Sequence, residues 1–373
     1  MVDKAMDNVY IWYSGATNVT GEKLVEALGC KGGRKKPAAK DVCMVIGWGA
    51  KTKEAVSLDK LPVMNHPDKI RDNRNKYRAL EVMAAAKVNV APFTNDAGNI
   101  AVSGAKANNV QLPVIGRRNY HQGGKGFWNC PTLSHVQAAL DEGAQYFQNL
   151  IEIKDEYRLH TFNGEIIHAV KKVKRSVAEM EKAYIEDELA RQKNIAETNG
   201  EAFNEDAVIP FLRRQAKKFA QDGANMLIRS NRMGWKFSRV TKYSKDLEKQ
   251  SAAALKALGL TFGAVDACVD VNDKVWIIEV NTGPGLEATT FDRWLEKFRE
   301  EIDAVLKPKS TARKIADKLT GGGKKKATMV QKAAAGSAKT DLQKKMELMQ
   351  QMVEAADEDE AATLNSVFGK MFG

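Results

Sequence analysis

The hydrophobic pattern near the N-terminus predicts a small parallel α/β unit. Apolar runs at Val9–Tyr13 and Val42–Ile46 are typical of buried strands, and helical spacing near Glu22–Leu28 lies between them, followed by a polar loop over residues 31–37. A strand, a helix and a strand in this order favour a parallel sheet. A longer helix is predicted over residues 65–87, because this segment begins with a capping residue, a proline and an acid.

The next two hundred residues alternate predicted strands and helices. A strand-rich section begins near Val88, and the turn Asn163-Gly164 between apolar segments predicts a hairpin over residues 151–173. Another strand pair is expected over residues 262–271 and 275–280. Helices are predicted over residues 176–224 (interrupted near Gly200), 247–258 and 290–305.

The end of the chain differs in composition and charge. Residues 307–338 hold glycine and lysine runs without an aromatic residue, which is typical of a flexible linker, and residues 340–372 have the apolar spacing of an amphipathic docking helix. The whole chain carries +11; residues 307–345 carry +10 and residues 346–373 carry −5, so that residues 1–306 carry only +6. The basic character is therefore concentrated in the tail.

The composition is that of a globular protein. The 373 residues are 43% hydrophobic and 28% charged, which favours two or three packed units. No apolar run approaches the roughly 18 residues of a membrane helix, and the N-terminus lacks the apolar core of a secretory signal, so we expect a cytoplasmic protein without membrane contact. The four cysteines are far apart in sequence, which excludes a zinc ribbon and predicts free thiols.

The strongest chemical pattern lies in the last two predicted strands. Asp266 lies in an apolar strand, and Glu279 and Asn281 alternate on one face of the next. If the strands pair, the three side chains converge. Two carboxylates and an amide oxygen are hard ligands suited to Mg²⁺. The alternative is that Glu279 is a buried acid paired with an arginine.

A second pattern is the glycine-rich segment His121-Gln-Gly-Gly-Lys-Gly126, just after Arg117-Arg118. Glycine-rich turns offer backbone N–H groups to phosphate, and neighbouring cations add charge. It is not a P-loop, because Lys125 precedes glycine and not serine or threonine. An ordinary flexible turn is the alternative, and the downstream carboxylates favour a nucleotide site.

These motifs resemble the ATP-grasp superfamily and, within it, the RimK-like carboxylate–amine ligases. The resemblance covers about residues 60–295 and centres on Glu279-Val-Asn281-Thr-Gly-Pro-Gly-Leu-Glu287, which is similar to that branch's metal-binding strand and loop. It implies that ATP is contacted by Lys76, Arg117, the phosphate-covering loop Gly123, Gly124, Lys125 and Gly126, the adenine hinge Asn149, Leu150 and Ile151, and Glu156 near the ribose. It assigns catalysis to Arg158, Arg229 and Asn231, and metal binding to Asp266, Glu279 and Asn281.

The fold implied by the resemblance is α/β and α+β, an ATP-grasp fold with an N-terminal α/β unit, two α+β subdomains that bind ATP between them, and a flexible basic tail. The expected divisions are residues 1–88 (N-terminal domain), 89–170 (lid), 171–306 (subdomain with the metal site) and 307–373 (Lys-rich linker and short helix). Residues 176–224 form a helical insertion that is long for this branch, and Arg117 stands where the family often has lysine.

The implied reaction joins a carboxylate to an amine through an acylphosphate and releases ADP and phosphate. It uses ATP and two Mg²⁺ ions, with Mn²⁺ as an alternative. The partners are a carboxylate donor and an amine acceptor, which a peptide or protein terminus or side chain could supply. Candidates for binding the anionic substrate are Arg158, Lys171, Lys172 and Arg175, for which a solvated sheet face is the alternative.

The sequence is also compatible with two other functions. An ATP-grasp body without ligase activity could bind nucleic acid or a protein partner through residues 307–373. A kinase-like phosphotransferase would give ADP and a stable phosphorylated product. Relatives of this kind also occur in tailed phages, which is compatible with a viral origin and a place in the host cytoplasm.

Overall fold

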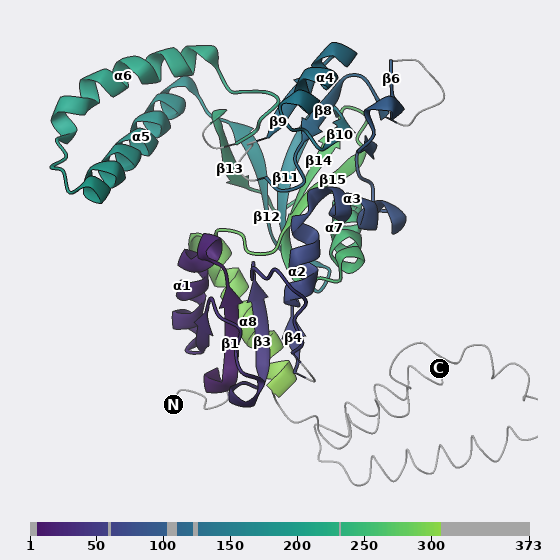
Figure 1. Cartoon of the computed structure of the whole chain (residues 1–373). Helices are drawn as coiled ribbons and strands as arrows, with labels where there is room; N and C mark the ends of the chain where they lie inside the picture. Colours follow the sequence, from purple (N-terminus) through teal and green to yellow (C-terminus); the bar gives the residue numbers. More distant parts are fainter. Residues whose placement is uncertain (1–5, 59–60, 103–109, 122–125, 231–232, 307–373) are drawn as a thin grey trace, which may run out of the picture. The chain divides into compact units, whose positions relative to one another are not determined.

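The computed structural model describes residues 6–58, 61–102, 110–121, 126–230 and 233–306. The predicted linker and docking helix of the tail lie outside these residues, as do Gly123, Gly124, Lys125 and Asn231. Within them, the chain forms a parallel four-stranded sheet, an antiparallel four-stranded sheet, an antiparallel five-stranded sheet and a short strand pair (Figure 1). Mixed α/β and α+β architecture, as predicted, is confirmed. The domain boundaries stay a prediction.

The N-terminal sheet has the strand order β2-β1-β3-β4 and is parallel throughout. It contains β1 (Val9–Tyr13), β2 (Lys31–Gly33), β3 (Met44–Trp48) and β4 (Val63–Met64), with α1 (Asn18–Leu28) between the first two. This confirms the predicted parallel unit. The predicted polar loop was wrong at residues 31–33, because β2 is a short edge strand without apolar side chains, in which Gly32 packs so closely that a Cβ would lie 2.2 Å from Val25.

The single helix predicted over residues 65–87 is two helices, α2 (Pro67–Arg74) and α3 (Lys76–Ala85). The break falls at Asn75, whose extended backbone lets its side chain accept a hydrogen bond of 3.1 Å from the Arg78 N–H and cap α3. His66, not Asn65, caps α2. Asn65 instead bonds the backbone of Phe262 at 2.8 Å, and so joins the N-terminal unit to the five-stranded sheet.

The four-stranded antiparallel sheet has the order β5-β10-β8-β9. Its strands are β5 (Phe93–Thr94), β8 (Val114–Arg117), β9 (Phe127–Cys130) and β10 (Tyr146–Asn149). Helix α4 (Leu133–Asp141) packs on it through Val136 and Ala139, which share a buried cluster with Phe147. The strand pair β6 (Ile100–Ala101) and β7 (Val110–Gln111) adjoins this cluster.

The five-stranded sheet has the order β13-β12-β11-β14-β15. Its strands are β11 (Ile153–Phe162), β12 (Glu165–Lys174), β13 (Trp235–Arg239), β14 (Phe262–Asp270) and β15 (Val275–Asn281), and all neighbours are antiparallel. Asn163 and Gly164 both adopt positive φ (49° and 84°), as a two-residue hairpin turn requires. The two predicted strand pairs are confirmed.

One face of the five-stranded sheet is apolar and is covered by α7 (Lys245–Leu258). A cross-strand row of Ala169, Leu159, Val265 and Val280 belongs to one buried cluster with Leu255 of α7. The residues next to these in sequence point to the other face. That second face carries the polar side chains of the candidate site.

Helix α8 (Ala288–Leu306) contributes two aromatic residues to a buried cluster. Its members are in ring contact with one another: Trp48, Phe162, Phe262, Trp294 and Phe298. Trp294 also donates a hydrogen bond of 3.0 Å to His160 Nδ1. Short 3₁₀ helices complete the described elements at Met6–Asn8, Gly15–Thr17, Ala39–Asp41 and Ala97–Asn99.

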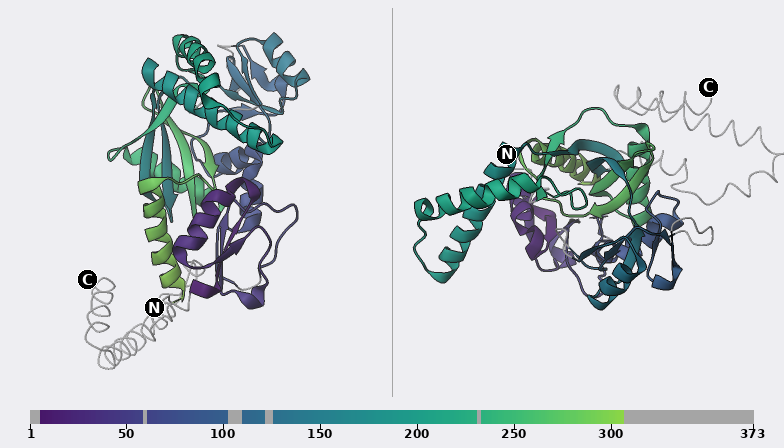
Figure 2. Two further views of the ribbon diagram at one scale, coloured as in Figure 1. Left: turned by 90° about the vertical axis from the view of Figure 1, so that its left-hand side faces the viewer. Right: turned by 90° about the horizontal axis from the view of Figure 1, so that it is seen from above.

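The predicted helical segment between β12 and β13 is a hairpin of α5 (Val177–Asn199) and α6 (Glu205–Asp222) (Figures 1 and 2). A capping box of Ser176 and Glu179 begins α5, and Gly200 with φ 71° ends it. The interruption predicted near Gly200 is therefore confirmed. Among the described residues, no helix has both the length and the apolar character that crossing a membrane requires.

Candidate active site

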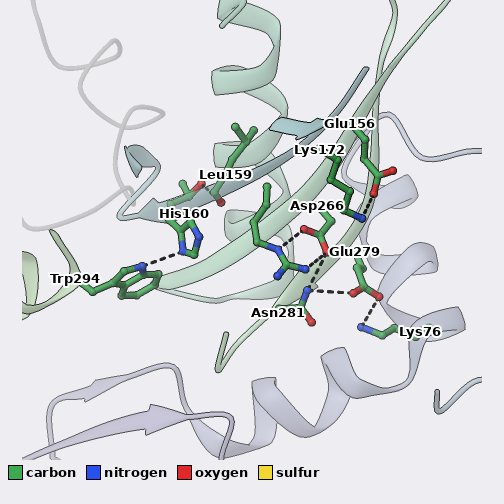
Figure 3. A network of polar contacts seen from close by, with 11 residues as sticks. Lys76, Glu156, Leu159, His160, Lys172, Asp266, Glu279, Asn281 and Trp294 are labelled. Carbon is green, nitrogen blue, oxygen red and sulfur yellow. Dashed lines mark hydrogen bonds and ion pairs between the residues drawn. The ribbon is translucent and has the colours of Figure 1, made fainter. Parts of the chain in front are cut away.

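Three oxygen-bearing side chains meet on the polar face of the five-stranded sheet (Figure 3). Asp266 of β14 lies directly opposite Glu279 of β15, and Asn281 follows two residues later. The Asn281 Nδ2 group donates to Asp266 Oδ2 at 3.1 Å and to Glu279 Oε1 at 3.0 Å. Strand alternation and pairing thus bring together the three residues expected to bind metal.

Two cations balance the two carboxylates. Arg158 of β11 lies opposite Asp266 and binds it with both Nε (2.7 Å) and Nη2 (2.8 Å), a bidentate pair that raises the arginine pKa. Lys76 Nζ lies 3.2 Å from Glu279 Oε2. Burial alone would raise the pKa of Glu279, but the charge of Lys76 and hydrogen bonds from Asn281 and Lys76 outweigh it and lower the pKa. Glu279 is therefore a partly buried acid whose ion pair is with a lysine and not with an arginine.

The residue types suit a divalent cation of the Mg²⁺ type, because two carboxylates and an amide oxygen are ligands for a hard cation that completes its shell with water and phosphate oxygens. In this structure the Asn281 NH₂ group faces the carboxylates, so the side chain would have to turn to present Oδ1 to a cation. Within the described part of the chain, no group of three or more His, Cys, Asp or Glu side chains could hold a metal. A metal at this site would therefore depend on two carboxylates, one amide and oxygen atoms supplied by a ligand.

Lys76 reaches Glu279 because of the break between α2 and α3. As the first residue of α3 it follows the Asn75 cap, and its backbone N–H donates to Asn119 at 2.8 Å. A continuous helix would continue the direction of α2, whereas the extended Asn75 sets a new one. The feature that the sequence prediction missed is thus the one that positions this lysine.

A pocket lies beside the carboxylates, between α3 and strands of the two antiparallel sheets. Its apolar wall includes Leu80, Met83 and Ile278; its polar groups include Asn73, Lys76, Arg117, His121, Gln148 and Glu279. A register shift in β15 opposite Asp266 and Ala267 lets the neighbours Ile278 and Glu279 both line it. Lys76 and Arg117, which the family resemblance places at the nucleotide, therefore share one pocket.

Two buried polar atoms in this pocket lack a hydrogen-bond partner among the described residues. They are Asn73 Oδ1 and Arg117 Nε. Asn73 Nδ2 is satisfied by the Val280 carbonyl at 2.8 Å, so its oxygen is the side that stays open. A buried polar atom without a hydrogen-bond partner lowers the stability of the fold, and such atoms are expected where a polar ligand binds. No sequence pattern indicated Asn73, which lies three residues before Lys76 in a different helix.

His121 lies against Arg117, with Arg117 Nη2 3.0 Å from His121 Nε2. Burial and the positive charge of Arg117 lower the His121 pKa to about 4, against a smaller opposite effect of Glu279. The imidazole is therefore neutral at pH 7. Its part in the structure is to hold the arginine, which leaves the charge of Arg117 for the pocket.

The other residues expected to contact ATP differ in whether their polar groups are already bonded within the protein. Glu156 is buried and ion-paired with Lys172, and burial is the main cause that raises its pKa. The backbone N–H groups of Asn149 and Leu150 donate to Pro92 (2.9 Å) and Pro113 (3.0 Å), so protein carbonyls already use them. No hydrogen bond is described for the Ile151 N–H. Gly126 has φ 63° and precedes β9.

Arg229 does not join the Asp266–Glu279–Asn281 group through any described contact. Its guanidinium donates to the Ile153 carbonyl at 2.8 Å and lies 4.7 Å from the Trp235 ring. These contacts hold the loop before β13 against β11. The catalytic role expected for Arg229 stays a prediction, and so does that of Asn231, which is outside the described residues.

The loop that follows Asn281 packs on the N-terminal unit. The Gly49 N–H donates to Thr282 at 3.0 Å, and a Cβ on Gly283 would lie 3.0 Å from the Gly49 nitrogen. The close approach of the two backbones favours glycine at position 283, whereas Gly49 has a positive φ of 59° that favours glycine there. This contact fixes the direction in which Asn281 leaves the sheet.

Comparison with known proteins finds solved structures that share the fold of this chain. No family model and no curated protein matches the sequence. Among solved structures, the D-alanine–D-alanine ligase from Bacillus anthracis complexed with ATP has a TM-score of 0.51 at 12% identity, covering 82% of this chain and 97% of that chain. The ATP-grasp ligase PsnB, complexed with a phosphomimetic variant of a minimal precursor, Mg and ADP, has a TM-score of 0.50 at 11% identity, covering 81% and 99%.

The chain has the ATP-grasp fold. A complex of PsnB with the unmodified minimal precursor, Mg and ADP gives the same result, with a TM-score of 0.50 at 11% identity over 81% of this chain and 98% of that one. At such identities the likeness concerns the fold alone, and an ATP-grasp fold supports more than one chemistry. The function must therefore be argued from the site.

Proposed function

We propose that the protein is an ATP- and Mg²⁺-dependent ligase that joins a carboxylate to an amine through an acylphosphate and releases ADP and phosphate. The observation that carries this proposal is that Asp266, Glu279 and Asn281 meet beside a pocket that contains Lys76 and Arg117. Carboxylates that can hold a metal and cations that can hold phosphates are both needed to position ATP for phosphoryl transfer.

The residues have distinct proposed roles. Asp266, Glu279 and Asn281 would hold Mg²⁺, which when bound neutralises the charge of the phosphates. Lys76 and Arg117 would bind phosphate oxygens, and the segment that ends at Gly126 would cover them. The open Asn73 oxygen would accept a hydrogen bond from ATP, and Glu156 would face the ribose.

Arg158 is placed to bind the substrate carboxylate or the acylphosphate. Its described hydrogen bonds to Asp266 use Nε and Nη2 and leave Nη1 without a described partner. An oxygen of the substrate carboxylate attacks the γ-phosphorus, and the bond to the β-phosphate oxygen breaks to release ADP. The amine nitrogen then attacks the acyl carbon, phosphate leaves, and the nitrogen loses a proton.

We also propose the RimK-like branch and a substrate that belongs to a peptide or protein. The branch rests on the strand and loop from Glu279 to Glu287 and on Arg158 of β11, which lies opposite Asp266. The substrate class is supported by the open edge of the site at β13, next to the α5–α6 hairpin. At this edge Phe237 is 46% exposed and lies beside Lys172.

Hydroxylamine trapping tests the proposal. Purified full-length protein is incubated with Mg-ATP, hydroxylamine and pooled carboxylate donors (amino acids, dipeptides and glutamate peptides), and ADP and hydroxamate are both measured. We expect hydroxamate together with ADP, because hydroxylamine intercepts an acylphosphate. We expect Asp266→Asn to lower both by at least about 100-fold, as for removal of a group that stabilises transition-state charge.

Asp273→Asn is the matched control, because Asp273 is an exposed acid in the β14–β15 turn that pairs only with exposed Lys154 among the described residues. This variant should retain full hydroxamate formation. Equal activity of Asp266→Asn and Asp273→Asn would contradict the proposed site. ADP release with a stable phosphorylated product and no hydroxamate would contradict the ligase and favour a phosphotransferase.

A further inference from the structure

The outer face of α6 differs from every other charged surface of the α5–α6 hairpin. Leu212, Ala216 and Ala220 are buried against α5 and define the inner face of the helix. Arg213, Arg214, Lys217 and Lys218 are all exposed; Arg214 and Lys218 lie opposite that inner face, and Arg213 and Lys217 lie beside it. We call these four residues the α6 cation stripe.

The α6 cation stripe makes no ion pair with any described acid. Among the described residues, the ion pairs of the hairpin are Lys182–Glu186 and Arg191–Glu188 within α5, and Lys236–Glu179 at its base. None involves the stripe. The acids of α6 itself lie at its ends, in the first turn and at Asp222. Four cations within six residues that repel one another without compensation are unfavourable for an isolated helix.

An exposed aromatic residue adjoins the α6 cation stripe. Phe211 is 51% exposed and lies three residues before Arg214 and seven before Lys218, which places all three along one side of the helix. A single exposed apolar residue is common on protein surfaces, so Phe211 contributes to the argument only through its position beside Arg214 and Lys218. The surface therefore combines positive charge with one apolar contact.

We propose that the α6 cation stripe and Phe211 form a docking surface for a short acidic segment of a polypeptide. Arg213 and Lys217 are separated along the helix by about 6 Å, as are Arg214 and Lys218. In an extended peptide, alternate side chains on one side are about 6.6 Å apart, so two acids two residues apart can meet two cations one turn apart.

The size and surroundings of the stripe favour a peptide over nucleic acid. The stripe extends only about 7.5 Å along the helix axis, which is short for a groove that follows a nucleic-acid backbone over several nucleotides. The neighbouring helix α5 contains six acids and three bases, so a long polyanion would meet like charge beside the stripe.

The position of the hairpin relates this docking surface to the candidate active site. The hairpin connects β12 with β13, the strands that contribute Lys172 and Phe237 to the polar face of the five-stranded sheet. A polypeptide bound to α6 would be held near the open edge of the site. This use as a substrate-docking element depends on the ligase function proposed above, whereas the binding itself does not.

Fluorescence anisotropy tests the binding without ATP. The probe is a fluorescein-labelled peptide of about four glutamates, short enough for the α6 cation stripe, with the glutamine peptide of equal length as its neutral control. In full-length protein at low salt, the variant Arg213→Gln/Arg214→Gln/Lys217→Gln/Lys218→Gln should bind the glutamate peptide about tenfold more weakly, as for the loss of four exposed ion pairs. The double variant Arg214→Gln/Lys218→Gln should lie between it and the unchanged protein.

The matched control removes the same charge elsewhere. Lys242, Lys245, Lys249 and Lys256 are exposed in or just before α7, and replacing all four with glutamine leaves α6 intact. This variant should bind the glutamate peptide like the unchanged protein. Because the net charge of both quadruple variants is equal, a difference between them reports the location of the site and not the charge of the chain.

Three results would overturn the proposal. The two quadruple variants could bind the glutamate peptide equally, or the glutamine peptide could bind as well as the glutamate peptide. The α6 variant could instead lose affinity for a labelled single-stranded oligonucleotide of about ten nucleotides and not for the peptide, which would make the stripe a nucleic-acid surface. Each of these leaves the ligase proposal intact, because the hydroxamate assay depends on Asp266 and not on α6.

Discussion

Two adjacent rows of the five-stranded sheet have opposite characters. The row Ala169–Leu159–Val265–Val280 is buried under α7. The adjacent row, Val170–Arg158–Asp266–Glu279, points to the polar face. The same strands therefore hold the fold together with one set of residues and present charge with the next. We expect changes in the first row and under it to alter stability, and changes in the second to alter chemistry.

The largest effect on stability is expected from Leu255→Ala. Leu255 is 1% exposed on α7 and belongs to the same buried cluster as Leu159 and Val265. Truncation should lower the free energy of unfolding by about 2–5 kcal/mol, because it removes buried apolar surface and leaves a cavity. Hydroxamate formation per folded molecule should not change.

Denaturant unfolding measures this difference, with Lys256→Ala as the control at an exposed position on the same helix. The control should unfold like the unchanged protein. If Leu255→Ala were as stable as Lys256→Ala, the apolar face would not be the one that stabilises the sheet. If it unfolded normally and lost hydroxamate formation, the division of labour between the two faces would be wrong.

A smaller effect on the free energy of unfolding is expected from protonation of a buried histidine on the polar face. His160 is 3% exposed, two residues after Arg158; burial, followed by the charges of Arg158 and His168, lowers its pKa to about 3. The unfolded chain binds a proton at about pH 6.5, so between pH 6.5 and 3 it binds more protons than the folded chain. Stability from this group is therefore present above pH 6.5 and falls by up to about 1.4 kcal/mol per pH unit as the pH decreases.

The variant His160→Asn tests this pH dependence, because asparagine keeps an acceptor for the Trp294 N–H and does not titrate. The free energy of unfolding, measured between pH 6 and 4, should fall less steeply with decreasing pH in the variant, by up to about 1.4 kcal/mol per pH unit. His135→Asn, at an exposed position of α4, is the control and should keep the slope of the unchanged protein. An unchanged slope in His160→Asn would contradict neutral burial of the imidazole.

The sequence alone was sufficient for features that depend on local spacing. Alternation along each strand and the short turn around Asp273 predicted that Asp266, Glu279 and Asn281 lie together, and the structure has them hydrogen-bonded. The Asn163-Gly164 hairpin and the division of the helical insertion at Gly200 follow from backbone conformations that few residues adopt.

Features that depend on distant pairing were not predictable in this way. The ion pair between Lys76 and Glu279 joins residues about two hundred positions apart and requires the break at Asn75, where a side-chain cap overrides a helical pattern. The open oxygen of Asn73 depends on a bond to the Val280 carbonyl across the same distance. Local patterns contain no information on which strand edge a helix terminus will meet.

In the proposed function, the polar face of the five-stranded sheet binds Mg-ATP through Glu279. Isothermal titration of ATP into the full-length protein, with Mg²⁺ and with EDTA, measures this binding. We expect binding that weakens at least about tenfold in EDTA and by a similar factor in Glu279→Gln, since both remove charge that positions the phosphates. Glu248→Gln, an exposed acid on α7, should bind like the unchanged protein. Absence of ATP binding, or equal affinity of Glu279→Gln and Glu248→Gln, would contradict the account.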